Sequence, residues 1–275
     1  MKRARFAGTA IAALVVSLAA AATPLRAHAA APLRVCADPD YMPYSNRAGA
    51  GFENKIAQLV GRELGRPIVY VWKSTRGESG FEEMVHQYVD QGKCDLVVDV
   101  PYAEADLQTT NPYYISSYVF VYKKGGGFDG ITSLDSPLLH HAKIGYEADT
   151  PVEDGLKLRT LTLGAKPFLT ADEEDASPKS IVDAVQNGTI NVGLTWDPAI
   201  AYFVGQYPDL TTAIIPNARS QGSPEQYTFP MSMGVRSNNA ALVGQLNRVI
   251  AQHLSQLDSI LTSYHIRFFK PSGNG

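Results

Sequence analysis

The chain has 275 residues, of which 45% are hydrophobic, and it carries 24 Lys and Arg against 27 Asp and Glu. A formal net charge of −3 and the lack of a basic run in the body of the chain argue against nucleic acid or anionic lipid as a partner. The length suffices for one large domain or for two lobes of ordinary size.

Residues 1–29 have the three parts of a secretory signal peptide. Met1–Arg5 is short and basic, residues 10–19 are almost entirely apolar, and Ala27-His28-Ala29 matches a small-x-small cleavage site. The apolar part falls short of the ~20 residues that span a bilayer, so we expect cleavage after Ala29 rather than a membrane anchor. The signal predicts export to the periplasm. Cleavage would leave 20 basic and 27 acidic residues, a net charge of −7.

Strand and helix patterns alternate in the next part of the chain, which we assign to lobe 1 (residues 30–120). In chain order they are a strand at Leu33–Ala37, a helix at Phe52–Leu64, a strand at Ile68–Trp72, a helix at Phe81–Val89 and a strand at Asp95–Val100. This order indicates a parallel sheet with helices on both faces, a doubly wound α/β lobe.

A second α/β unit follows a strand at Tyr118–Tyr122, after which Gly125-Gly126-Gly127 indicate a flexible crossing point. Its expected elements are a strand at Lys143–Tyr146, a helix from Pro151, a helix at Ile181–Gln186, a strand at Ile190–Leu194 and a helix at Asp197–Tyr202. A strand at Met231–Val235 and a helix at Leu242–Tyr264 then complete the first lobe. The sequence therefore predicts two doubly wound α/β lobes joined by a two-strand hinge, with lobe 2 at 121–227 and the return at 228–275.

The only cysteines are Cys36 and Cys94. In an oxidising compartment an even pair first indicates a disulfide, and two buried free thiols are the alternative. Cys36 lies near the end of the first strand and Cys94 at the start of the third. These strands are neighbours in the usual order of such lobes, about 4.8 Å apart, which favours the bridge. Its role would be structural, because no Cys-x-x-Cys spacing is present.

Several segments resemble type 2 periplasmic solute-binding proteins. They are Leu33–Ser45, Gly51–Glu53, Gly92–Val97, Asn111–Tyr114 and Trp196–Ala199, in the order and spacing of that family. The two cysteines, Ser45-Asn46 with Gly51–Asn54, and Thr109–Phe120 resemble a narrower group, the quinoprotein-dehydrogenase-associated J proteins of methanol oxidation (MoxJ and XoxJ). That resemblance implies a periplasmic partner, a methanol dehydrogenase dependent on pyrroloquinoline quinone (PQQ), with its cytochrome c as a further candidate. It implies no cofactor in this chain.

Amino-acid-binding members of that family hold the ligand carboxylate with an Arg, which offers two parallel donors. The Arg comes from a turn shortly before the Pro-Tyr-Tyr segment. Here the corresponding stretch, Pro101–Gln108, has no Arg and contains Glu104 and Asp106. An α-carboxylate would be repelled there, so we expect any ligand to be something other than an amino acid.

Residues at strand ends and in loops are the candidates for the cleft. The aromatic ones are Tyr41, Tyr44, Trp72, Tyr102, Tyr146, Trp196 and Tyr227, and the polar ones are Asp38, Arg76, Thr150 and Asp197. The rings suit stacking on an apolar ligand or contact with a protein, and the alternative is packing within their own lobe. Asp197 stands where the family holds a ligand's amino group, although Asp before Pro favours a helix N-cap. Arg76 offers the cleft a charge or is solvated, and Thr150 donates to an anion or caps its helix.

No pattern indicates catalysis or a metal site. None of the histidines after residue 29 has a partner three or four residues away with a carboxylate between them, as a zinc-binding helix would require. Asp172–Asp175 lacks the alternating spacing of a calcium loop, and no nucleophile elbow or phosphate-binding loop occurs. We expect a non-enzymatic accessory protein that binds the dehydrogenase or assists its maturation. The alternatives are an ABC-transporter substrate-binding protein for a small non-amino-acid solute and, less favoured, an enzyme on this fold such as a cyclohexadienyl dehydratase.

Overall fold

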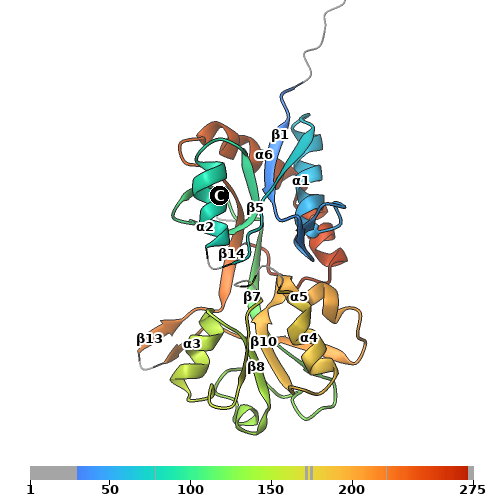
Figure 1. The fold of residues 1–275 in the computed structure, drawn as a ribbon, viewed down its shortest axis with the longest axis vertical. Coiled ribbons are helices and arrows are strands. Elements are labelled where there is room, and N and C mark those ends of the chain that lie inside the picture. The colour runs from blue at the N-terminus through green and yellow to red at the C-terminus, as the bar shows by residue number, and fades with distance from the viewer. Residues whose placement is uncertain (1–29, 78, 171–172, 174–175, 221, 272–275) are drawn as a thin grey trace, which may run out of the picture.

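The computed structural model describes residues 30–77, 79–170, 173, 176–220 and 222–271, so the predicted signal peptide lies outside it. The chain forms two lobes, one above the other in Figure 1, which long strands connect. Each lobe has a sheet with helices on both faces, as the sequence predicts for a doubly wound α/β unit. Among the described residues, no helix has both the length and the hydrophobicity needed to cross a membrane.

Lobe 1 is built on three parallel strands, in the spatial order β4 (Ile68–Trp72), β1 (Leu33–Ala37) and β5 (Leu96–Pro101). Helices α1 (Phe52–Glu63) and α6 (Ala240–Ser263) cover one face, and α2 (Gly80–Met84) with the π-helical turn Val85–Val89 covers the other. Leu33 and Val35 of β1 pack into the core between the sheet and helices α1 and α6, whereas Cys36 packs into the core between the sheet and α2. Because side chains alternate along a strand, β1 contributes residues to both cores.

Lobe 2 repeats this layering with shorter elements. Its strands are β8 (Ile144–Glu147), β9 (Lys166–Phe168), β10 (Val192–Trp196) and β11 (Leu210–Ile214), and its helices are α3 (Pro151–Leu158), α4 (Lys179–Gln186), α5 (Asp197–Val204) and a 3₁₀ turn at Pro137–His141. Helix α3 packs on one face of the sheet, and α4 with α5 packs on the other. The small hairpins are β2 (Asp40–Tyr41) with β3 (Ser45–Asn46), and β12 (Ala218–Ser220) with β13 (Ser223–Glu225).

Two long strands carry the chain between the lobes, β7 (Tyr114–Lys123) outward and β14 (Thr228–Arg236) back. They pair antiparallel with each other between the lobes, and β14 also pairs with β5 and with β6 (Leu107–Thr109). One sheet therefore runs through both lobes in the order β4-β1-β5-β14-β7-β10-β8-β9. The prediction of a glycine crossing point is wrong: Gly125–Gly127 follow the far end of β7, because paired extended strands make the crossing.

The C-terminal tail makes a third connection across the hinge. Phe269 and Ile115 of β7 exchange two backbone hydrogen bonds of 2.9 Å. The Arg267 amide donates to Asp197 Oδ2 at 2.7 Å. Asp197 is the first residue of α5 and its N-cap is Trp196, so the predicted Asp197 cap is wrong. Its buried carboxylate binds the tail instead, and burial raises the Asp197 pKa to about 7.

Cys36 and Cys94 form a disulfide, as the sequence predicts, with their Cα atoms 5.6 Å apart. Strands β1 and β5 are parallel neighbours in which Cys36 stands opposite Val97, so Cys94 lies just before the paired part of β5. Both cysteines are buried between the sheet and α2. The bridge fixes the register of the two strands whose ends carry the cavity described below.

Removing the bridge should destabilise the protein without abolishing the fold. Replacing both cysteines, Cys36→Ser with Cys94→Ser, releases a loop of 58 residues, which is worth about 4 kcal/mol on the chain-entropy account. Urea unfolding followed by circular dichroism should show a clearly lower midpoint than for the parent. The parent under reductant should match the double variant, and an unchanged midpoint in both would contradict the prediction.

Candidate functional site

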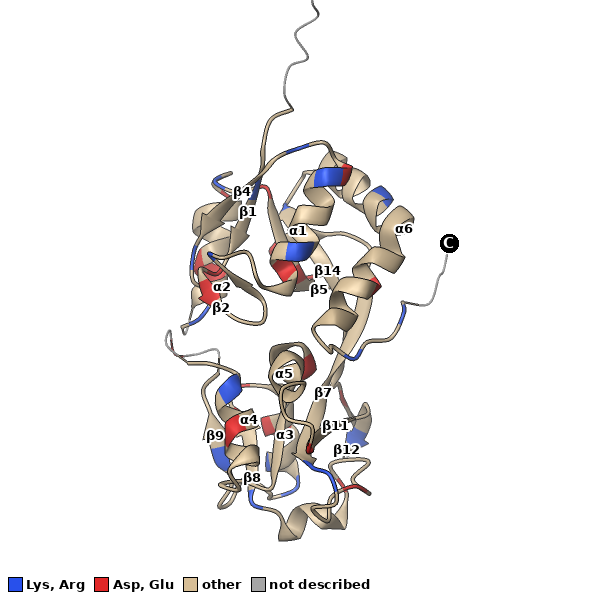
Figure 2. Cartoon of the chain, turned by 90° about the vertical axis from the view of Figure 1, so that its right-hand side faces the viewer, with Lys and Arg blue, Asp and Glu red and all other residues tan. Residues whose placement is uncertain are grey.

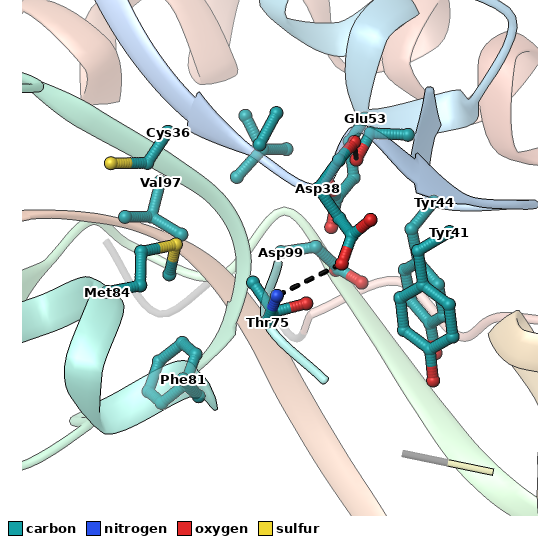
Figure 3. Close-up of a pocket in the computed structure, with 13 residues that line it drawn as sticks. Cys36, Asp38, Tyr41, Tyr44, Glu53, Thr75, Phe81, Met84, Val97 and Asp99 are labelled. Atoms are coloured by element: carbon teal, nitrogen blue, oxygen red, sulfur yellow. Dashed lines mark hydrogen bonds between the residues drawn. The ribbon is translucent and has the colours of Figure 1, made fainter. Parts of the chain in front are cut away.

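A cavity of about 130 Å³ lies at the carboxyl ends of β1 and β5, where lobe 1 faces lobe 2 (Figure 3). Its polar lining is Asp38, Tyr41, Tyr44, Ser45, Glu53, Thr75 and Asp99, and its apolar lining includes Cys36, Phe81, Met84 and Val97. The carboxyl ends of parallel strands are where open α/β sheets bind their ligands. The cavity is smaller than the roughly 300–1,000 Å³ of typical small-molecule sites.

Asp38 directly follows β1, and its side chain is only 2% exposed. Its Oδ1 accepts from the Asp40 amide at 2.8 Å, and its Oδ2 accepts from the Ser74 hydroxyl at 3.1 Å and the Thr75 amide at 3.0 Å. Figure 3 shows the Thr75 bond beneath the carboxylate. Ser74 and Thr75 lie in the loop after β4, so Asp38 ties the ends of two neighbouring strands and is held in one orientation.

Asp99 reaches the cavity through a bulge in β5. Val97 and Val100 both pack on the α2 side although they are three residues apart, and the register with β14 shifts at this point. Asp99 is the extra residue, with a φ of 63°, in the left-handed region that Asp tolerates better than most residues. Its carboxylate accepts hydrogen bonds from the hydroxyls of Tyr113 and Tyr114.

Burial and crowding raise the pKa values of two cavity carboxyls. Burial raises the pKa of Asp99 to about 7, although the hydrogen bonds from Tyr114 and Tyr113 oppose the change. The pKa of Glu53, in the first turn of α1, is raised well above its ordinary value by burial and by the charges of Asp99 and Asp38. No Lys, Arg or His is among the described residues that line the cavity. Such a site favours a cation or a proton and repels an anion.

Tyr41 and Tyr44 form the wall toward lobe 2, with ring centroids 5.0 Å apart. The Tyr41 hydroxyl donates to the carbonyl oxygen of Thr170 in lobe 2 at 3.2 Å. The Thr170 hydroxyl donates in turn to Glu147, whose buried carboxylate also accepts from the Thr195 hydroxyl. The two lobes are therefore in direct contact across the mouth of the cavity.

Arg76 lies at the same mouth. Its side chain is only 10% exposed, with Nε 3.5 Å from Asp38 Oδ2 and Nη1 donating to the Ala176 carbonyl of lobe 2 at 3.1 Å. Of the two interpretations offered by the sequence, a solvated Arg and a charge supplied to the cleft, the structure supports the second.

The other predicted site residues lie away from the cavity. Trp72 ends the edge strand β4, stacked on Tyr70 and beneath Arg47. Tyr102 is 51% exposed in the turn after β5. Trp196 packs against Tyr118 at the crossing strands. None of these three lines the acidic cavity.

Two predicted cleft tyrosines belong instead to the core of lobe 2. Tyr227 is 1% exposed and donates its hydroxyl to Glu225, and Tyr146 is buried in the same cluster. The prediction that Tyr227 lines the cleft is therefore wrong, because the chain re-enters the lobe 2 core before β14 begins. Thr150 occupies the N-cap of α3, yet its hydroxyl donates to the Glu147 carbonyl at 2.7 Å, so it is not directed at an anion.

Sequence reasoning missed Glu53 and Asp99, the two carboxyls with raised pKa values. Both left a signal. Asp99 is the single acid in the apolar run of β5, a position that acids seldom occupy without a role. Glu53 belongs to the Gly51–Glu53 segment that carries the family resemblance. The described residues contain no group of three or more His, Cys, Asp or Glu arranged to hold a metal ion, and of the acidic run 172–175 only Glu173 is described.

The raised Asp99 pKa predicts a stability that falls as pH rises. The folded protein keeps the Asp99 proton up to about pH 7, whereas the unfolded chain loses it near the ordinary value of 3.8, so stability decreases between these limits. Asp99→Asn keeps an acceptor for Tyr114 and should flatten this decrease in urea unfolding from pH 5 to 7.5. Asp95→Asn is the matched control. Arg34 holds the pKa of Asp95 below its ordinary value, so this substitution should not change the dependence of stability on pH between pH 5 and 7.5. Equal slopes in parent and Asp99→Asn would refute the assignment.

Comparisons with known proteins agree with this architecture. Residues 33–265 match the family described as bacterial extracellular solute-binding proteins, family 3. The chain is 29% identical over 242 residues to Protein MoxJ of Paracoccus denitrificans, covering 84% of this chain and 86% of the relative.

Two solved structures extend the likeness to three dimensions. The crystal structure of MxaJ from Methlophaga aminisulfidivorans MPT superposes with a TM-score of 0.78 at 25% identity, over 86% of this chain and all of that one. The periplasmic binding protein XoxJ from Methylobacterium extorquens AM1 gives 0.67 at 28% identity, over 87% of this chain and all of that one. The fold is that of type 2 periplasmic binding proteins, and the chain belongs to the bacterial extracellular solute-binding proteins of family 3.

Proposed function

We propose that this chain is a periplasmic accessory protein of a PQQ-dependent methanol or alcohol dehydrogenase system. It acts by binding the dehydrogenase or by assisting its maturation, and it catalyses no reaction itself. The observation that carries the proposal is the likeness to MoxJ, MxaJ and XoxJ over more than four fifths of this chain. These relatives are of the J type that the cysteine spacing and the Thr109–Phe120 segment resemble.

The cavity supports a role other than amino-acid capture. An amino acid needs a cation for its carboxylate, and the cavity presents Asp38, Glu53 and Asp99. The turn that carries the clamp Arg in the family holds Tyr102 and two acids here, with Tyr102 exposed to solvent. The cavity of about 130 Å³ is also smaller than the sites that hold ligands of ordinary size.

Co-purification from the periplasm tests the proposal. A tagged copy of the full chain, exported by its own N-terminus in a methanol-oxidising host, should recover the dehydrogenase after mild cross-linking. A tagged amino-acid-binding protein of the same family, expressed to the same level, is the control and should recover none. Recovery by neither protein, with the dehydrogenase present in the extract, would reject the binding role.

Activity in a strain without the gene separates binding from maturation. If the chain assists maturation, the dehydrogenase from that strain should be present but low in PQQ content and in methanol-dependent dye reduction. Normal PQQ content and activity would exclude the maturation role and keep only the binding role. Normal growth of that strain on methanol, together with no dehydrogenase recovered in the co-purification, would reject both roles.

A second candidate function is that of a substrate-binding protein for a small cationic solute, delivered to an ABC transporter. The observation that favours it is the cavity itself, with three carboxyls and two tyrosine rings in a space that suits a few heavy atoms. Methylammonium chloride should then raise the melting temperature, since a ligand at 100 times its Kd stabilises by about 2.7 kcal/mol. Sodium acetate should not, and Asp99→Asn should lose the response. Equal shifts with both salts would reject this function.

A further inference from the structure

Arg76 makes the contacts that a bound guanidinium ligand would make. Its Nε lies 3.5 Å from the Asp38 carboxylate, its Nη1 donates to the Ala176 carbonyl at 3.1 Å, and its Cζ stands 5.0 Å from the centre of the Tyr41 ring. A carboxylate, a carbonyl oxygen and an aromatic face are the three partners that recognise this cation in proteins.

The contacts of Arg76 divide between the two lobes. Asp38 and Tyr41 follow β1 in lobe 1, whereas Ala176 stands just before α4 in lobe 2. The hydrogen bond from the Tyr41 hydroxyl to the Thr170 carbonyl likewise has its donor in lobe 1 and its acceptor in lobe 2. Met42 and Tyr44 of lobe 1 also pack against the core formed by α4 and α5. One side chain of lobe 1 thus reaches across to lobe 2.

The charges around the cleft explain why a cation is needed there. Asp38, Glu53 and Asp99 line the cavity of lobe 1, and the buried Glu147 of lobe 2 adds its charge to the field at Tyr41 and Tyr44. Closing the lobes brings these carboxyls together in a region of low dielectric, where like charges repel. Among the ion pairs of the described residues, Arg76 with Asp38 is the only one that involves any of the four.

We propose that Asp38, the Tyr41 ring and the Ala176 carbonyl form a guanidinium-binding subsite, which the protein fills with its own Arg76. Arg76 is then an internal ligand that closes the cleft without a solute. The subsite accepts a free guanidinium or a primary ammonium group only when the Arg76 side chain is absent. This proposal is independent of the dehydrogenase as a partner, so it stands or falls separately from the first function proposed above. It competes with the second, because a cleft filled by Arg76 does not take up a cationic solute.

Small-angle X-ray scattering on the exported, mature protein tests the closure. The parent should have the radius of gyration of the closed structure, and Arg76→Ala should have a larger one because its lobes separate. Arg47→Ala is the matched control: its guanidinium also lies over an aromatic ring, Trp72, at 5.5 Å, but on lobe 1 alone. Tyr41→Phe removes the neighbouring interlobe bond and keeps the ring, so it should open the cleft less than Arg76→Ala.

Chemical rescue tests the subsite. Methylguanidinium chloride at millimolar concentration should return the radius of gyration of Arg76→Ala to the parental value and raise its melting temperature. Sodium chloride at the same ionic strength should do neither, and the parent should not respond to methylguanidinium. Arg76→Gln, which keeps most of the side-chain length, guards against a fold defect in the alanine variant and should open in the same way.

Three results would overturn the proposal. A parent protein that is already open in solution would show that Arg76 does not close the cleft. A radius of gyration unchanged in both Arg76→Ala and Arg76→Gln would show the same. An opening that methylguanidinium reverses no better than sodium chloride, or reverses equally in an Asp38→Asn, Arg76→Ala double variant, would show that no guanidinium subsite exists.

Discussion

The antiparallel pairing of β7 with β14 is the interaction on which the rest of the molecule depends. Tyr114–Ser117 and Thr228–Met231 pair where the chain passes between the lobes, so one sheet continues from β4 to β9. A paired ribbon resists sliding of one strand along the other and leaves bending as the soft motion. The Phe269–Ile115 bridge adds a third strand-like segment, and the bond from the Arg267 amide to Asp197 anchors it to α5. Any opening of the cleft must therefore bend these connections together.

The charges at the site are the reverse of those that bind an amino acid. In amino-acid-binding members of the family, a cation after this strand holds the ligand carboxylate, but here β5 bulges and places Asp99 at the cavity. The positive charge comes instead from Arg76, after β4, which is separated from β5 by β1. It meets Asp38 rather than a solute, so a charge that recognises ligands elsewhere holds the lobes together in the proposed mechanism. Figure 2 shows both signs of charge distributed over helices and loops of the two lobes, so the local excess of acid at the cavity does not reflect one acidic face.

The architecture could be predicted from the sequence because its signals are local and repeated. The apolar runs of β1, β4 and β5 and the helical periodicity of α1 and α6 are long enough to be unambiguous, and strand order placed Cys36 beside Cys94. Three-residue strands such as β6 and β9 show no periodicity at that length. The site was harder, since roles there depend on distant contacts. Tyr227 was expected in the cleft and is in the core, and Asp197 binds a tail 70 residues away. Whether Asp99 pointed inward depended on a bulge, which a strict alternation does not predict.

A cleft that closes on an internal Arg would differ from a transport receptor in what it offers a partner. A receptor must present two surfaces, one open and one closed, because its transporter distinguishes the loaded form from the empty one. A chain that remains closed in the absence of solute presents a single surface, and a protein partner then binds without first ordering the two lobes. Burial raises the pKa values of Glu53 and Asp99, which favours their neutral forms and limits the repulsion that closure creates. The same residues that make the site unsuitable for an amino acid are thus compatible with a rigid two-lobed body, which is the form that docking on a dehydrogenase would use.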